Sequence, residues 1–229
     1  MTFPLEVRFL NQIFESESNF STKVLNNLSF NLSMGNKLLV CGPSGSGKTS
    51  LIHSITGLLK PTSGEICWFG ENIWDFNESN RDAWRKSNIG IAFQEFNLIG
   101  ELNPLQNILI PATFSNWSIP KSILERAQFL LDEFDIKEYK KPLDELSRGE
   151  QQRVAIARAL ILDPPIIIAD EPTASLDEEN SNKIVDLLAN FTTENKVLII
   201  VSHDLSHEKF STHKLTLDKA GNYQFKSFN

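Results

Sequence analysis

The residues at positions 42–49 have the types and spacing of a phosphate-binding loop. Gly-Pro-Ser-Gly-Ser-Gly-Lys-Thr fits the pattern G-x-x-x-x-G-K-[ST] and directly follows the apolar run at 38–41. Glycines let backbone N–H groups turn toward phosphate oxygens, where a Cβ would obstruct the approach. Lys48 is placed to reach the terminal phosphates, and Thr49 to offer its hydroxyl to Mg²⁺. The sequence therefore predicts a nucleoside triphosphate site.

A helix is expected directly after this loop. Apolar residues recur from Ser50 to Leu59, and the N-terminal dipole of such a helix would face the phosphates. The order of strand, loop and helix argues against a chance glycine-rich segment. On this side of the nucleotide we expect Gly42, Pro43, Ser44, Gly45, Ser46, Gly47, Lys48, Thr49 and Ser50.

Two adjacent carboxylates, Asp170 and Glu171, follow the apolar run at 166–169. Side chains alternate in direction along a strand, so neighbouring carboxylates at its end can have different roles. In a P-loop ATPase the first holds Mg²⁺ and the next polarises the water that attacks the γ-phosphate. We therefore assign Asp170 to the metal and Glu171 to the general base, against the plainer interpretation of an acidic loop.

The segment at 146–153 carries a helix-start signal. Ser147 and Glu150 form the S-x-x-E pattern of a capping box, in which the serine begins the helix. A helix start with a serine and a glycine can also bind an anion. Together with the loop at 42–49 and the carboxylates at 170–171, this segment resembles the L-S-G-G-Q signature of the ATP-binding cassette (ABC) superfamily.

The resemblance implies an active unit of two copies arranged head to tail around two ATP molecules. Ser147, Gly149 and Glu150 would then adjoin the nucleotide held by the other copy, with Ser147 and Gly149 on its γ-phosphate. The chain departs from the pattern at two positions, with Arg148 in place of glycine and Glu150 in place of glutamine. The glutamate keeps the capping box, whereas the arginine alters the local backbone and adds a charge that suits a phosphate.

Three further segments resemble the same superfamily, in the expected order. Gln94 matches the glutamine that contacts Mg²⁺ and the attacking water at the hinge between two lobes. Ser175-Leu176-Asp177 matches the loop that links the two sites across the dimer, and His203 matches the histidine that touches the γ-phosphate. The catalytic residues implied are Glu171, His203, Gln94 and Lys48, and the metal ligands Thr49, Gln94 and Asp170.

The superfamily also stacks an aromatic ring on adenine, and two phenylalanines are candidates here. Phe14 and Phe20 both precede the Val24-Leu25 pair. We prefer Phe14, because in similar proteins of the superfamily the aromatic residue lies about ten residues ahead of that pair. A plain core or surface role is the alternative for either ring.

The elements that must position these residues follow from apolar patterning. The predicted strands lie at 7–13, 24–32, 37–41, 65–69, 166–169 and 197–201. Helical spacing extends from about 96 to 159. With the resemblance, this predicts an α/β fold: a P-loop NTPase core with a mixed, largely parallel sheet, an antiparallel β subdomain and an inserted helical subdomain. We expect one ABC ATPase domain over 1–229, with a core lobe at about 1–95 and 163–229 and a helical lobe at about 96–162.

The composition excludes several classes of protein. With 22 basic and 29 acidic residues the net charge is −7, which opposes a nucleic-acid surface. Cys41 and Cys67 lie in strand-like runs, which favours buried, reduced thiols over a disulfide. There is no signal sequence and no apolar run of about eighteen residues. We expect a cytoplasmic chain that does not enter the membrane alone.

Within the superfamily, the chain is most similar to the stand-alone subunits of the lipoprotein-releasing and macrolide-export group. The similarity rests on the segments at 61–64, 91–98, 105–108 and 151–160. It implies ATP hydrolysis that drives an integral membrane permease subunit for export, extraction or force transmission. The chain would then be peripheral on the inner face of the cell membrane. The substrate and the direction of transport would be set by that partner.

Two other function classes stay open on the sequence. A cassette ATPase could serve a soluble assembly complex, such as iron–sulfur cluster assembly, and co-purification with a membrane protein would separate the two. A nucleotide-gated switch without hydrolysis is opposed by the intact Glu171 and His203. A GTPase would need an N-K-x-D motif, which the sequence does not contain.

The residues after Gln94 indicate where a membrane partner would bind. Phe96, Leu98 and Ile99 give this segment an apolar character, and we expect them to be exposed beside the cleft between the lobes. Exposed apolar residues require a partner, and an amphipathic helix could place its apolar side there. The alternative is that Phe96 and Leu98 pack inside the helical lobe.

Overall fold

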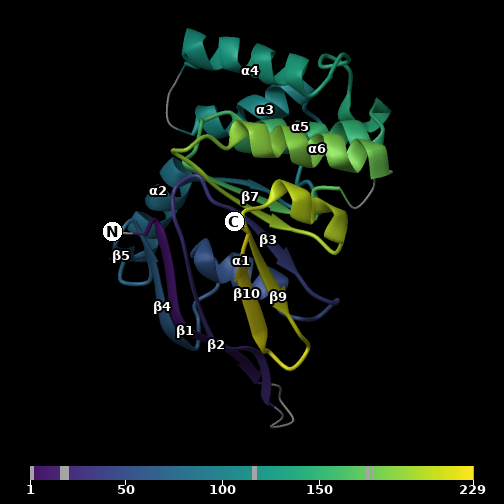
Figure 1. The fold of residues 1–229 in the computed structure, drawn as a ribbon. Coiled ribbons are helices and arrows are strands. Elements are labelled where there is room, and N and C mark those ends of the chain that lie inside the picture. Colours follow the sequence, from purple (N-terminus) through teal and green to yellow (C-terminus); the bar gives the residue numbers. More distant parts are fainter. Residues whose placement is uncertain (1–2, 16–20, 115–117, 174–175, 177, 229) are drawn as a thin grey trace.

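The computed structural model, shown in Figure 1, describes residues 3–15, 21–114, 118–173, 176 and 178–228. At its centre is a six-stranded sheet with the strand order β10-β9-β3-β8-β7-β6. The strands are β3 (Lys37–Cys41), β6 (Ile89–Ala92), β7 (Ile166–Asp170), β8 (Val197–Val201), β9 (His213–Leu217) and β10 (Tyr223–Ser227). Every neighbouring pair is parallel except β9 and β10. The carboxyl ends of β3, β6, β7 and β8 therefore meet at one edge.

A second, antiparallel sheet has the order β2-β1-β4-β5. Its strands are β1 (Leu5–Glu15), β2 (Ser21–Leu32), β4 (Ser63–Trp68) and β5 (Glu71–Asn72). Contacts between β2 and β10 join the two sheets: the backbone N–H of Ser29 donates to the Tyr223 hydroxyl at 3.1 Å, and the rings of Phe30 and Phe225 are 5.5 Å apart. These contacts fix the first strands beside the edge of the central sheet.

Helix α1 (Lys48–Ile55) lies between the two sheets (Figure 1). The strand before it is apolar on both faces, and both faces are covered. Leu38 and Val40 share a buried cluster with α1 and the antiparallel sheet, whereas Leu39 and Cys41 belong to the cluster on the helical side. This explains why β3 is a continuous apolar run rather than an alternating one.

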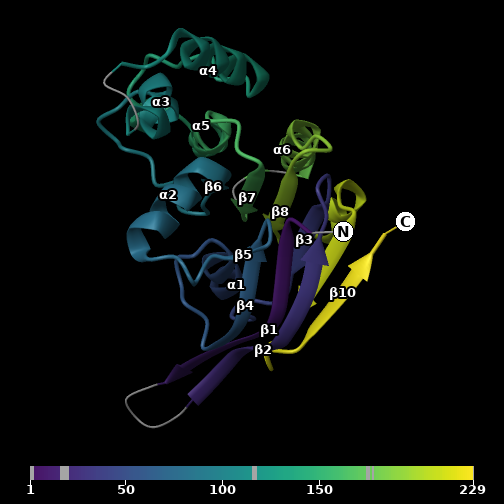
Figure 2. The same cartoon turned by 90° about the vertical axis from the view of Figure 1, so that its left-hand side faces the viewer.

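Most of the remaining helices cover the face of the central sheet opposite α1, at one end of the molecule (Figures 1 and 2). The helix Glu78–Asn88 instead lies on the α1 side, where Arg85 donates to the carbonyl oxygens of Thr56 and Gly57 at 3.1 Å. The remaining helices are α2 (Glu78–Asn88), α3 (Pro104–Thr113), α4 (Lys121–Glu133), α5 (Arg148–Leu160) and α6 (Glu178–Phe191), with short 3₁₀ segments η1 (Leu143–Glu145) and η2 (Leu205–Phe210). One buried cluster joins Leu130 and Phe134 of the α4 region to Ile167 and Leu198 of the sheet. The division into a core lobe and a helical lobe stays a prediction.

The predicted fold class is confirmed, with small differences in the elements. The helix after the phosphate-binding loop ends at Ile55 rather than near Leu59, because Gly57 adopts a left-handed conformation with φ of +75°. Both cysteines are free, and burial raises the pKa of each thiol, but Cys67 is only half-buried, unlike Cys41. The expectation of two buried thiols is therefore met by Cys41 alone.

Candidate functional site

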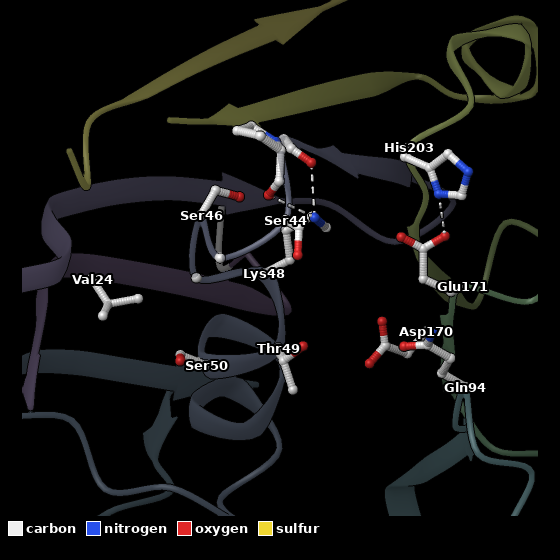
Figure 3. Close-up of a pocket in the computed structure, with 14 residues that line it drawn as sticks. Val24, Ser44, Ser46, Lys48, Thr49, Ser50, Gln94, Asp170, Glu171 and His203 are labelled. Carbon is white, nitrogen blue, oxygen red and sulfur yellow. Dashed lines mark hydrogen bonds and ion pairs between the residues drawn. The ribbon is translucent and has the colours of Figure 1, made fainter. Parts of the chain in front are cut away.

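A cavity of about 560 Å³ opens at the carboxyl edge of the central sheet. It is lined by the loop at 42–50 together with Val24, Gln94, Asp170, Glu171 and His203. In Figure 3, Lys48 and Thr49 face the two carboxylates, Gln94 and His203 across this space. Ligands bind at this edge in open α/β sheets, because the strand-end loops converge there. Residues far apart in the sequence thus surround one cavity.

The loop at 42–49 is shaped by its glycines. Gly45 has φ of +78° and open space where a Cβ would project, whereas a Cβ on Gly42 would come within 2.5 Å of the Leu217 carbonyl oxygen. Gly42 is thus required by close packing and Gly45 by backbone conformation. The Nζ of Lys48 donates to the carbonyl oxygens of Gly42 and Pro43 at 2.8 and 3.1 Å, which holds the ammonium over the loop.

The start of α1 is suited to an anion. Its N-cap is Gly47, which makes no side-chain capping bond, so the first N–H groups of the helix point toward the cavity without a side-chain acceptor. The hydroxyl of Ser46 is buried and has no hydrogen-bond partner among the described residues. These groups can bind phosphate oxygens.

Oxygen donors for a cation lie on both sides of the cavity, namely Thr49, Gln94 and Asp170. Asp170 is 7% exposed, and burial raises the pKa of its carboxyl, with Glu171 adding to the effect. A bound cation would oppose this shift, because it favours the ionised carboxylate. Mg²⁺ prefers oxygen ligands and keeps waters and phosphate oxygens in its shell, so this sparse donor set fits it. The described residues contain no cluster of three His, Cys, Asp or Glu that could hold a metal alone.

Glu171 and His203 form a pair. The Nδ1 of His203 lies 2.9 Å from Oε2 of Glu171, and the His203 ring is largely exposed to the cavity. Glu171 has φ of +50°, a conformation that costs free energy in a residue other than glycine, and its N–H donates to the Val201 carbonyl oxygen at 3.0 Å. The constrained backbone turns this carboxylate toward the cavity and the imidazole.

The signature segment lies outside this cavity. Ser147 caps α5: its hydroxyl accepts from the Glu150 N–H at 3.3 Å, and the Glu150 carboxylate accepts from the Ser147 hydroxyl at 2.6 Å and N–H at 2.9 Å. These bonds lower the pKa of the Glu150 carboxyl. A Cβ on Gly149 would lie 3.0 Å from the Leu176 side chain, so α5 packs closely against that residue. The predicted capping box is present, and none of Ser147, Gly149 and Glu150 lines the cavity.

The segment after Gln94 is held by two arginines on α5. Arg158 donates to the carbonyl oxygens of Phe96 and Asn97 at 2.5 and 2.6 Å, and the Arg148 guanidinium lies 5.4 Å from the Phe96 ring. Phe96 is buried and Leu98 is half-buried, whereas Ile99 is exposed. The expectation that Phe96 would be exposed is wrong, because its ring packs under Arg148 and its backbone is bound by Arg158.

Of the residues near the start of β2, Val24 lines the cavity and Phe14 does not. Phe14 is 43% exposed, pairs with Thr22 at the end of β1 and is not among the residues lining the cavity. Phe20 lies outside the described residues, as do Ser175 and Asp177. Val24 lies beside Gly47 in the cavity wall, which the sequence analysis did not predict. Its position a few residues after the two candidate adenine-stacking phenylalanines could have indicated this. Adenine stacking by Phe14 stays a prediction.

Among the described helices, none has the length and hydrophobicity needed to cross a membrane.

Comparison with known protein families and relatives gives a consistent picture. Residues 25–174 match the family described as ABC transporter. The lipoprotein-releasing system ATP-binding protein LolD of Syntrophus aciditrophicus is 38% identical over 205 residues, covering 88% of this chain and 91% of the relative. LolD of Buchnera aphidicola subsp. Acyrthosiphon pisum is 39% identical over 190 residues, covering 82% and 83%.

Solved structures agree. The dimeric structure of MJ0796, described as a bacterial ABC transporter cassette, superimposes with a TM-score of 0.90 and 31% identity, covering 98% of this chain and 99% of the other. A dimeric structure of the same cassette in a post-hydrolysis state, bound to ADP and Pi, gives the same values. The likeness therefore extends over the full set of elements described above.

Proposed function

Since this chain belongs to the ABC transporter family and is an ATP-binding, ATP-hydrolysing subunit of a transporter, we propose that it works as a head-to-tail homodimer enclosing two ATP molecules. One observation carries the proposal. The start of α5, with the anion-binding types Ser147 and Gly149, lies outside the cavity formed by the chain's own phosphate-binding loop. A second copy would bring that helix start to the open side of the cavity.

In this proposal the described residues divide the work of hydrolysis. Lys48 and the N–H groups of the loop bind the β- and γ-phosphates, and Gln94 positions the attacking water. The Glu171 carboxylate accepts a proton from that water while the water oxygen bonds to the γ-phosphorus. The bond between the γ-phosphorus and the oxygen of the leaving ADP breaks in the same step. His203 holds Glu171 and donates toward the phosphate oxygens. The constrained backbone of Glu171 keeps its carboxylate in place for this transfer.

We further propose that Thr49, Gln94 and Asp170 hold Mg²⁺. When bound, the ion would neutralise charge on the transferred phosphoryl group. The fit rests on the oxygen donors that line the cavity.

A complementation experiment tests the head-to-tail arrangement. Lys48→Ala disables the phosphate-binding loop, and Ser147→Arg blocks the signature side, so each variant alone should be inactive. Mixed together, they form heterodimers with one intact composite site and one doubly defective site. ATPase activity in the mixture, and in neither variant alone, is the expected result. A mixture as inactive as its components would refute the proposal, provided both variants are folded by circular dichroism.

The membrane partner is expected to bind a groove beside β6. This groove, of about 180 Å³, is lined among others by Lys86, Ile91, Phe114, Arg158 and Leu162. Phe114 is 73% exposed, and Lys86 lies 5.8 Å from its ring. An exposed apolar ring beside two cations suits an amphipathic helix that carries an acidic residue. Residues of β6 line the groove, and the same strand leads to Gln94 in the cavity. The bound partner and the nucleotide would therefore both contact β6 or the residues just after it.

Substitution of Phe114 tests this surface. Phe114→Asp should abolish co-purification with the permease from detergent extract while ATP binding by the isolated subunit is kept. Phe9→Asp is the matched control, because Phe9 is 65% exposed on the antiparallel sheet, away from the groove. Equal capture of the permease by both variants would move the docking surface elsewhere.

The transported substrate is proposed from the relatives. The LolD proteins are named as subunits of a lipoprotein-releasing system, and we infer that this chain powers the extraction of a lipid-anchored protein from a membrane. The test is release from proteoliposomes that contain the co-purified complex. ATP should release an acylated protein and leave a transmembrane-anchored protein of equal size in place. Release of neither, from a complex with active ATPase, would refute the substrate class.

A further inference from the structure

A completely buried histidine outside the proposed catalytic set connects two parts of the site. His207, on the 3₁₀ segment η2, has no exposed surface. Its Nε2 lies 2.9 Å from the hydroxyl of Ser181 on α6, and its Nδ1 lies 3.0 Å from the hydroxyl of Ser202. Both ring nitrogens are thus bonded to side chains of different elements.

Each serine belongs to a segment of proposed function. Ser202 directly precedes His203, the residue paired with Glu171. The backbone N–H of Ser202 donates to the carbonyl oxygen of Val40, in the strand that leads to the phosphate-binding loop. Ser181 lies in α6, the helix that follows Leu176, and Leu176 packs against Gly149 of the signature segment. The imidazole therefore stands between the signature side and the hydrolytic side of one chain.

We propose that His207 is a positioning residue for ATP hydrolysis, which transmits the position of α6 to the segment carrying His203. The proposal rests on the roles proposed above for His203 and Glu171. Ser181, His207 and Ser202 form the link, and none of them lines the cavity. Contact of the signature side with a second copy would then be sensed at Glu171 through this link.

The hydrogen bonds define the state of the ring. Burial lowers the pKa of the His207 imidazole below its ordinary 6.5, which favours the neutral ring, and the Asp204 carboxylate, 3.6 Å from Nε2, opposes the shift. A neutral imidazole has one donor and one acceptor, so one serine must donate its hydroxyl proton and the other must accept. The Ser202 hydroxyl also accepts the N–H of Asp204 at 3.0 Å. The two tautomers differ in which serine donates, so exchanging them requires rotation of both hydroxyls and transfer of the ring proton from one nitrogen to the other, which gives the link two definite arrangements.

A role in packing alone would not require these bonds. An apolar side chain could fill a space between α6 and η2, whereas a buried imidazole whose bonds are lost is destabilising. The arrangement also locks His207 to the 3₁₀ turn, since the Ser211 hydroxyl donates to the His207 carbonyl oxygen at 3.3 Å. The His207 ring and backbone thus join the segment 202–211 to α6 by hydrogen bonds.

Steady-state kinetics of four variants test the proposal. Ser181→Ala removes one hydrogen bond and His207→Leu removes both while keeping an apolar filler, and His207→Gln keeps an amide that can bond a serine. We expect kcat to fall about five- to tenfold in Ser181→Ala and further in His207→Leu, with partial recovery in His207→Gln, as loss of a buried hydrogen bond predicts. KM for ATP should change less than about twofold, because the link does not touch the nucleotide. Ser54→Ala is the matched control, since Ser54 is buried and its hydroxyl has no partner among the described residues.

A spectroscopic measurement on the unsubstituted ring adds a second arm. In ¹⁵N-histidine spectra, His207 should be neutral and its nitrogen shifts should change when ATP is added to the Glu171→Gln protein. Unchanged shifts would overturn the proposal, as would a kcat loss of the same size in Ser54→Ala. If His207→Leu does not fold, Ser181→Ala and the spectra decide. Full turnover in His203→Ala would refute the proposed site itself, whereas normal turnover in Ser181→Ala beside an inactive His203→Ala refutes the coupling alone.

Discussion

The phosphate-binding loop and the signature segment are the two regions of this chain proposed to bind phosphate, and they differ in how closely each matches its sequence pattern. The loop at 42–49 matches its pattern fully and already lines a cavity with Asp170 and Glu171. The signature segment departs from its pattern at Arg148 and Glu150 and lines no part of that cavity. The loop is organised by the chain itself, whereas the signature segment would contact a nucleotide only in the proposed dimer.

The groups that each region offers also differ. The loop presents backbone N–H groups and the Lys48 ammonium, which are positioned before a ligand binds. In the signature segment the Ser147 hydroxyl already donates to the Glu150 carboxylate. Binding of a γ-phosphate there would require Ser147 to exchange this acceptor for a phosphate oxygen beside a negative charge. We therefore expect large effects of substitution on the loop side and smaller, tunable effects on the signature side.

The largest effect is expected at Glu171. Glu171→Gln should leave ATP binding intact and slow hydrolysis by about 10²–10⁴-fold, because a positioned general base is lost. ATP should then hold a stable dimer, visible by gel filtration. Glu101→Gln, an exposed glutamate outside the cavity, is the control. Near-normal turnover in Glu171→Gln would remove that residue from its proposed role and erase the contrast between the two regions.

The next largest effect is expected at Phe14. Its ring should contribute about 1–3 kcal/mol to ATP binding if it stacks on adenine as aromatic rings do on bases. Phe14→Ala should therefore weaken binding while Phe20→Ala does not, as measured by titration with a fluorescent ATP analogue. Phe14 lies on the hairpin that also carries the cavity residue Val24. The opposite ranking would assign adenine to Phe20.

How far the sequence predicted these features depends on how local their causes are. The phosphate-binding loop and the Ser147 cap were predicted because each is set by residues close in sequence. The burial of Phe96 was not predicted, since it depends on Arg148 and Arg158, which lie on a helix distant in the chain. The 3₁₀ segment at 205–210 also lacked a local signal, and His207 acquires its partner Ser181 only when α6 packs against it.

A smaller effect of defined sign is expected from the two departures in the signature. Glu150→Gln removes a negative charge that would face the partner's γ-phosphate, and the amide can still cap Ser147. ATP-dependent dimerisation should therefore tighten by about two- to fivefold, the size of a partly exposed charge interaction. Arg148→Gly should weaken it by a similar factor, because a positive charge is lost. Dimer dissociation constants in the Glu171→Gln background, at low and high salt, would measure both. Shifts of equal sign would show that charge does not control this side.

The smallest effect is expected in the link between the two regions, as a pH dependence of stability. The folded-state pKa of His207 is lowered from 6.5 by burial, so the unfolded chain binds more protons below that value. The stabilising contribution is present above pH 6.5 and is lost as the pH falls through the folded-state pKa. The melting temperature of the unsubstituted protein should thus fall more between pH 6.5 and 5 than that of His207→Gln, by about a few degrees. His213→Gln should flatten the curve as well, because burial also lowers the pKa of His213, and since that ring contacts Thr212 and Phe225 instead of α6 the effects of the two substitutions should add. Parallel curves for the unsubstituted protein and His207→Gln would mean that the His207 ring does not stay neutral between the two serines, and the two regions would then lack this connection.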